Sequence, residues 1–178
     1  MRHKPIKSKL FAQNRKRIAE LMAPKALAVI NANDVLPTNA DGTLPMQPNA
    51  DLFFLTGIEQ EESILVLFPD AADEKHREIL FLRQPNEQLQ IWEGYKHTKA
   101  DARKISGVKN VKWLSEFPVL FRSLMCEAES AYLNSNEYKR ANVEVQTRDM
   151  RFIGQCQSDF PLHQYRRLAP LLHELRVV

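Results

Sequence analysis

The chain has 178 residues, of which 44% are hydrophobic and 26% are charged, and its formal net charge is +3. This length suits one ordinary globular domain and is too short for two. The longest uninterrupted apolar run, Ile64–Phe68, is far too short to cross a bilayer, so we expect no membrane association. Two cysteines and the lack of an apolar leader favour a cytoplasmic protein over an exported one.

Positive charge is concentrated near the N-terminus. Residues 1–17 hold seven basic side chains and no acidic one, so the remainder of the chain carries −4. Such an arm can bind nucleic acid or an acidic partner, or it can be the solvated face of a helix. Aromatic interleaving, which base stacking needs, does not accompany the charge. We therefore expect a solvated helix face and no nucleic-acid partner.

The first third of the chain contains a helix, a strand and a long loop. Ser8 is a plausible N-cap for a helix that runs to Met22, with one apolar stripe, before a proline stops it. Ala26–Ile30 predicts a short buried strand. The polar passage 31–48 has no periodicity, which is typical of a functional or mobile loop.

Two apolar runs then predict a strand pair at the centre of the sheet. Leu52–Leu55 and Ile64–Phe68 have the length and composition of buried strands. Between them, Gly57 can take a positive φ and reverse the chain. The run Glu78–Arg83 predicts a third strand, antiparallel to Ile64–Phe68.

Helices and strands alternate through the rest of the chain. We predict helices over 98–106, 116–127 and 142–156, and strands over 108–114 and 131–133. This order predicts an α/β domain whose mixed β-sheet is flanked by helices. The tail from Phe160 is interrupted and apolar, and it stops without a cap, as at a domain boundary.

The motifs of familiar catalytic and metal sites are missing. No glycine-rich phosphate loop and no standard metal-ligand spacing occurs. Two pairs, His97 with Asp101 and His173 with Glu174, resemble ligand pairs, but surface or hydrogen-bonded histidines are the better interpretation. Cys126 and Cys156 are expected to pack, because no histidine lies near them in the sequence.

The stretch from Ile91 to Tyr95 is the best local candidate for a functional surface. Trp92 lies beside Gly94 after a polar loop, where an indole can offer a flat apolar wall with one donor. Alternatively, Trp92 covers the end of the sheet.

Four segments resemble the aminopeptidase P enzymes. The run Asn49–Gly57 resembles N-S-D-F-x-Y-L-T-G, and Glu61–Leu67 resembles the E-x-x-L-V-L that follows it. Ile91–Gly94 is similar to I-W-x-G, and Leu171–Arg176 is similar to the h-x-H-E-x-R that precedes the catalytic domain of that family. Together the segments cover the chain in order.

The resemblance implies that residues 1–178 are the N-terminal domain of an Xaa-Pro aminopeptidase of the creatinase/prolidase family, with a ribonuclease-H-like topology. It implies hydrolysis of peptides with proline at the second position, by two manganese ions. Their ligands would lie in a C-terminal pita-bread domain after residue 178. No catalytic or metal-binding residue is then assigned to this chain.

In the family, this domain walls the substrate cleft and builds a homo-oligomer. On that basis Trp92, Gly94 and Tyr95 are the residues that we expect to line the cleft. Many relatives carry an arginine where this sequence has Gln47, which leaves any contact of that arginine in doubt here. Two alternatives stay open, namely a protein-binding module like a histone-chaperone subunit that has lost its metal ligands, and the N-terminal domain of a prolidase or creatinase.

Overall fold

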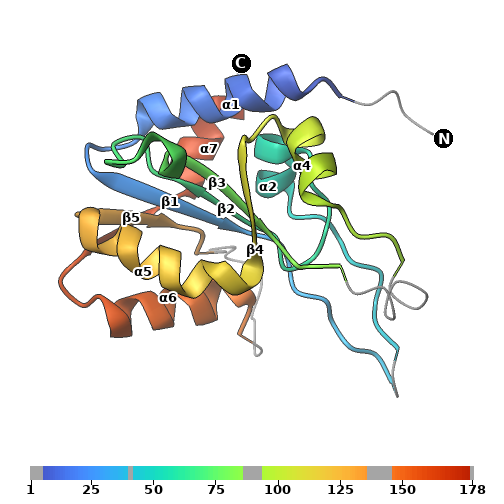
Figure 1. The fold of residues 1–178 in the computed structure, drawn as a ribbon. Coiled ribbons are helices and arrows are strands. Elements are labelled where there is room, and N and C mark those ends of the chain that lie inside the picture. Colours follow the sequence, from blue (N-terminus) through green and yellow to red (C-terminus); the bar gives the residue numbers. More distant parts are fainter. Residues whose placement is uncertain (1–5, 40–41, 86–93, 136–145, 177–178) are drawn as a thin grey trace.

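The computed structural model describes residues 6–39, 42–85, 94–135 and 146–176, and Figure 1 shows their fold. They contain one sheet with the strand order β4-β3-β2-β1-β5-β6. The strands are β1 (Ala26–Asn31), β2 (Ile64–Leu67), β3 (Glu78–Leu82), β4 (Asn110–Trp113), β5 (Ser130–Leu133) and β6 (Gln164–Arg167).

The helices are α1 (Ser8–Leu21), α2 (Ala50–Thr56), α4 (Lys99–Ser106), α5 (Phe117–Glu127), α6 (Arg148–Asp159) and α7 (Ala169–Arg176), with short 3₁₀ turns at η1 (Glu74–His76) and η2 (Leu114–Glu116). None of the helices in the described ranges is both long enough and apolar enough to cross a membrane.

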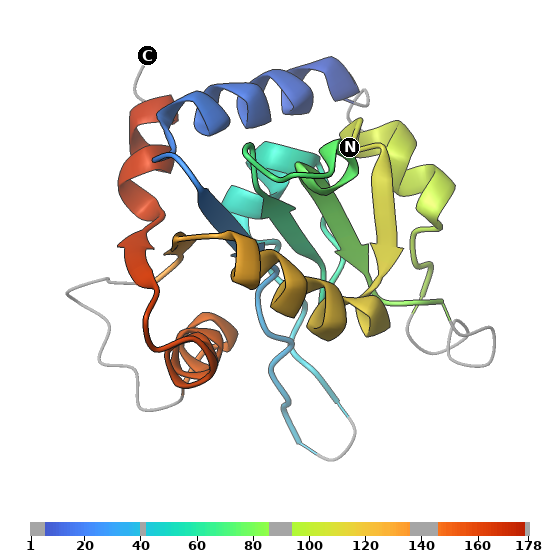
Figure 2. The ribbon, with the colours of Figure 1, turned by 60° about the vertical axis from the view of Figure 1, so that its left-hand side comes forward.

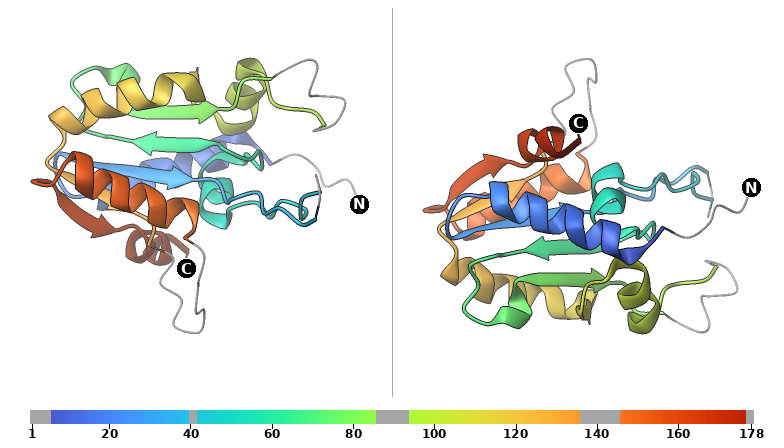
Figure 3. Two further views of the ribbon diagram at one scale, coloured as in Figure 1. Left: turned by 90° about the horizontal axis from the view of Figure 1, so that it is seen from below. Right: turned by 90° about the horizontal axis from the view of Figure 1, so that it is seen from above.

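The sheet is mixed, as predicted. Strand β2 runs antiparallel to β1 and β3, while the pairs β1–β5, β3–β4 and β5–β6 are parallel. The register places Asn31 opposite Ile64, and Ile64 opposite Phe81. The start of β2 therefore lies at the same edge as the carboxyl ends of the other five strands. We call this the loop edge, and Figure 3 shows the 32–49 loop and the 94–98 segment projecting beyond it.

The two faces of the sheet carry different helices. One face packs against α1, α2, α4 and α7 and the other against α5 and α6, and Figure 2 shows α1 and α5 on opposite sides. Successive strand residues alternate between these cores, so Ala28 faces the first and Val29 the second. Both cores are apolar, which is why the central strands read as continuous apolar runs.

The predicted strand at Leu52–Leu55 is wrong, because these residues belong to helix α2. The Asn49 side chain caps this helix by accepting the backbone N–H groups of Asp51 and Leu52, each at 3.0 Å. The chain does turn at Gly57, whose φ of +69° ends the helix as a left-handed cap. Strand β2 instead pairs with β1 and, as predicted, with β3.

Other observed element boundaries also differ from the predicted ones. The helix predicted from residue 142 begins at Arg148, after the cap residue Thr147, and ends at Asp159; residues 142–145 lie outside the described ranges. The cap of α1 is Lys7 and not Ser8, and its side chain forms no capping bond. In the tail, β6 and α7 were not predicted. Strand β6 is largely polar, whereas Leu168, Leu171, Leu172 and Leu175 do have the i, i+3, i+4, i+7 spacing of a helix.

The basic N-terminal segment is only partly the solvated face that we expected. The Arg15 side chain is 1% exposed, so its guanidinium lies in the interior of the domain. Its Nη1 donates to the carbonyl oxygens of Leu55 at 2.8 Å and Ser106 at 2.9 Å, and its Nε donates to the Glu78 carboxylate at 3.0 Å. Burial lowers the pKa of Arg15, which Glu78 partly offsets. One arginine thus joins α1 to α2, α4 and β3.

Candidate functional site

The three predicted cleft residues have different outcomes. Trp92 lies outside the described ranges. Gly94 has a φ of +75°, which a glycine adopts without strain, and nothing lies within 4 Å of the position of a Cβ. Tyr95 is 70% exposed, and its hydroxyl donates to the Asp101 carboxylate at 2.5 Å. Whether these residues line a cleft stays a prediction.

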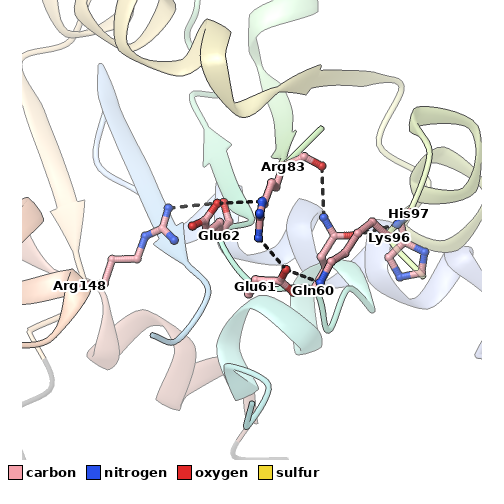
Figure 4. Close-up of polar contacts among 7 residues, drawn as sticks. All are labelled: Gln60, Glu61, Glu62, Arg83, Lys96, His97 and Arg148. Carbon is pink, nitrogen blue, oxygen red and sulfur yellow. Dashed lines mark hydrogen bonds and ion pairs between the residues drawn. The ribbon is translucent and has the colours of Figure 1, made fainter. Parts of the chain in front are cut away.

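The segment after Tyr95 is anchored to the loop that precedes β2. Lys96 Nζ lies 2.5 Å from Glu61 Oε1, and the two side chains are only 12% and 14% exposed. Arg83 at the end of β3 approaches the same Glu61 oxygen at 3.5 Å. Glu61 therefore holds two cations from segments far apart in the sequence (Figure 4).

Gln60 forms a second link between the same segments. Its Oε1 accepts the backbone N–H of His97 at 2.7 Å, and its Nε2 donates to the carbonyl of Arg83 at 3.4 Å. Gln60 is buried, so both bonds are shielded from water. The side chain consequently fixes the backbone at residue 97 relative to the end of β3.

Glu62 and Arg148 extend this network toward α6. Glu62 takes a φ of +57°, and its carboxylate lies 3.7 Å from Arg83 Nε. The guanidinium of Arg148 donates to the Glu62 carbonyl at 3.4 Å. We call the seven residues of Figure 4 the loop-edge cluster: Gln60, Glu61, Glu62, Arg83, Lys96, His97 and Arg148. The acidic run 59–62 is visible in the sequence, but its partners come from three other segments and carry no local signal.

His97 and Asp101 do not act as the ligand pair that we considered. Asp101 completes the capping box of α4, since the N–H and the hydroxyl of Thr98 both donate to it. These bonds and that of Tyr95 lower the pKa of Asp101 to about 2. His97 Nδ1 is buried with no partner among the described residues, and burial lowers the pKa of the ring. The His97 and Tyr95 rings meet edge to face, with centroids 5.9 Å apart.

The described residues do not fit a metal centre. Within the described ranges, no group of three or more His, Cys, Asp or Glu side chains comes close enough to hold an ion. Cys156 is buried, and burial raises the pKa of its thiol to about 12, so its predicted packing role is confirmed. Cys126 is exposed, so the prediction that it packs is wrong.

Gln47 lies at the loop edge beside α6. It lines a cavity of about 300 Å³ together with Asp34 and Arg148. The Asn33 side chain donates to the Gln47 carbonyl at 3.0 Å and accepts from Asn49 at 2.9 Å, which ties this loop to the cap of α2. Gln47 stands where we expect an arginine in many relatives. In this chain a different arginine, Arg148, lines the same cavity as Gln47.

Comparison with known proteins agrees with this fold. Residues 11–133 match the family described as aminopeptidase P, N-terminal domain. Over 135 residues, or 76% of this chain, the sequence is 28% identical to Xaa-Pro aminopeptidase of Escherichia coli (strain K12), of which it covers 30%.

Solved structures give the same picture. A structure described as that of an aminopeptidase P from Bacillus anthracis has a TM-score of 0.85 at 26% identity, over 97% of this chain and 41% of that one. A variant of Escherichia coli aminopeptidase P in complex with substrate has a TM-score of 0.75 at 24% identity, over 98% and 40%, which bears on the fold alone. The chain thus spans less than half the length of these relatives. Since the family match covers most of the chain and the mixed sheet agrees with it, this chain belongs to the aminopeptidase P N-terminal domain family.

Proposed function

We propose that this chain is the N-terminal, non-catalytic domain of an Xaa-Pro metalloaminopeptidase, an enzyme that removes the residue preceding a proline. The observation that carries the proposal is the family match over residues 11–133, supported by the similarity to an Xaa-Pro aminopeptidase. The chemistry would belong to a C-terminal catalytic domain of the same protein. Two manganese ions would be bound by that domain, because the described residues here do not fit a metal.

The part of this domain that we assign to substrate handling is the segment of Trp92, Gly94 and Tyr95. Its support is the anchoring of the following residues by the loop-edge cluster, where Glu61 and Gln60 fix the backbone at Lys96 and His97. A wall of a substrate cleft has to be positioned before the peptide arrives, since any ordering on binding costs affinity. The exposed ring of Tyr95 then has a rigid base. We also propose that the full protein is a homo-oligomer in the cytoplasm.

Activity measurements test the assignment directly. The purified chain is incubated with an Xaa-Pro peptide and added manganese, and no hydrolysis is expected, whereas turnover would overturn the non-catalytic role. Joined to its catalytic domain, the protein is expected to cleave the peptide. In that protein Trp92→Ala should lower kcat/KM while leaving the unfolding midpoint unchanged, and an unaltered kcat/KM would reduce Trp92 to a packing residue.

A further inference from the structure

A groove between α5 and α6 is not used by the proposed function. It has a volume of about 650 Å³, within the range of small-molecule sites. Both helices lie on the same face of the sheet in Figure 1. The groove is open to solvent and reaches the loop edge, where Asn31 and Arg148 line it.

The wall of the groove is a contiguous set of aromatic rings. Phe117 and Phe121 stack with centroids 5.0 Å apart, and Phe152 and Phe160 approach Phe121 at 5.3 Å and 6.1 Å. Because each ring packs against another, the wall is formed before any ligand arrives. Such a wall suits an aromatic or branched aliphatic group.

The end of the groove at the loop edge carries a positive charge with spare hydrogen-bonding capacity. A guanidinium has five N–H donors, and that of Arg148 makes one long bond among the described residues, 3.4 Å to the Glu62 carbonyl. The neighbouring Arg151 is engaged, since it donates to Asp34 at 2.8 Å. Arg148 therefore keeps N–H donors that can bind a carboxylate through two parallel hydrogen bonds, while Glu62, Asp34 and Asp149 lie near enough to offset part of its charge.

A buried acceptor lies at the same end. Asn31 is 3% exposed, and its Nδ2 donates to Asp149 at 2.8 Å, which fixes the orientation of the amide. Its Oδ1 is buried and has no partner among the described residues. Buried acceptors are nearly always satisfied, so one left over beside a groove indicates a missing donor. An ammonium or another N–H group of a ligand would supply it.

We propose that this groove binds a free α-amino acid with an aromatic or branched aliphatic side chain. The carboxylate would pair with Arg148, the ammonium would donate to Asn31 Oδ1, and the side chain would lie against the phenylalanine wall. A free α-amino acid of this kind places a carboxylate, an N–H donor and an apolar group on a single carbon. Binding there would also reach the loop-edge cluster, because Arg148 belongs to both.

Calorimetric titration of the chain with L-phenylalanine tests the ligand class. Phenylalaninamide lacks the carboxylate, 3-phenylpropionate lacks the ammonium, and glycine lacks the side chain. Each analogue is expected to bind at least about tenfold more weakly than phenylalanine, the effect of losing one good interaction. No measurable binding of phenylalanine, or equal binding of the amide and the amino acid, would overturn the proposal.

Three variants locate the site. Arg148→Gln removes the charge together with the bond to the Glu62 carbonyl, and Val119→Trp adds bulk at a rim position that is 80% exposed and outside the core. Both are expected to weaken phenylalanine binding at least about tenfold, with unchanged circular dichroism. Arg166→Gln, an exposed arginine on β6, is the matched control and should bind normally. Binding that survives both groove substitutions, or falls equally in the control, places the ligand elsewhere and ends the proposal.

Discussion

The guanidinium of Arg15 and the carboxylate of Glu78 meet at 3.0 Å between helix α1 and strand β3, and the arginine side of this pair is almost fully buried. The same guanidinium satisfies carbonyl groups at the ends of α2 and α4. Both helices end there, and the last carbonyls of a helix have no intrahelical donor. The Arg15 side chain therefore satisfies carbonyl groups at the ends of α2 and α4, and it also links helix α1 to strand β3.

We expect Arg15→Ala to lower the free energy of unfolding by about 3 kcal/mol, because it leaves two buried carbonyls without a donor. Urea unfolding followed by circular dichroism measures this change. Arg17→Ala, an exposed arginine on the same helix, is the matched control and should change stability by less than about 0.5 kcal/mol. Equal effects of the two substitutions would contradict the role given to Arg15.

Two glycines should respond to alanine with opposite signs. Gly57 has a φ of +69°, and a Cβ there would lie 2.5 Å from the Phe11 ring, so Gly57→Ala should destabilise the chain by at least about 2 kcal/mol. Gly154 lies within α6 with nothing within 4 Å of the same position. Gly154→Ala should stabilise the chain by roughly 0.5–1 kcal/mol, since it removes conformational freedom from the unfolded state. Thermal or urea unfolding measures the change in stability of both variants. A Gly57→Ala variant as stable as the original chain would mean that Phe11 can move aside.

The anchoring of residues 94–97 predicts a local effect of Lys96→Met. Without the ammonium, Glu61 keeps the longer contact with Arg83, and the bond between Gln60 and His97 is what still ties the described part of this segment to the loop before β2. Hydrogen exchange at the His97 amide should then accelerate roughly tenfold, which corresponds to about 1.4 kcal/mol of local opening. Lys104→Met, an exposed lysine on α4, should leave that amide unaffected. Unchanged exchange in Lys96→Met would show that the ion pair does not restrain the segment.

His97 should make stability depend on pH. Burial lowers the pKa of its ring in the folded chain, against opposing effects of Asp101 and Glu59. Below the unfolded value of about 6.5, the unfolded state binds more protons than the folded state. The free energy of unfolding should therefore be highest above about pH 6.5. It should fall as the pH drops toward the pKa of His97 in the folded chain. Chemical unfolding between about pH 5 and 8 should show a shallower slope in His97→Gln than in the original chain, and parallel slopes would exclude this role for His97.

The strand and helix order of most of the chain could be predicted from local patterns. Strands β1, β2 and β3 are apolar runs of the right length, and α4 carries both a capping box and a C-terminal glycine. The error at Leu52–Leu55 arose because four apolar residues suit a strand or a buried helical turn equally. The deciding signal was the capping asparagine at position 49, whose side chain satisfies the first turn.

Most contacts of the loop-edge cluster could not be predicted from local sequence patterns. Residues 59–62 form an acidic run in the sequence, yet Lys96 lies 35 residues from Glu61 in the chain, and Arg148 lies 86 from Glu62. Only the sheet order brings these segments to one edge. Likewise, the buried state of Arg15 has no counterpart in the sequence, where it is one of seven similar charges near the N-terminus.

The attachment of both Arg83 and Lys96 to one carboxylate has a consequence for how this domain can vary. Residues 83 and 96 are thereby held close together, whatever the length of the chain that connects them. For a connection with fixed ends, the entropic cost of extra residues grows only with the logarithm of its length. We therefore expect residues inserted between these two cations to leave α4 and the sheet in place, provided that Glu61 and its two partners are retained.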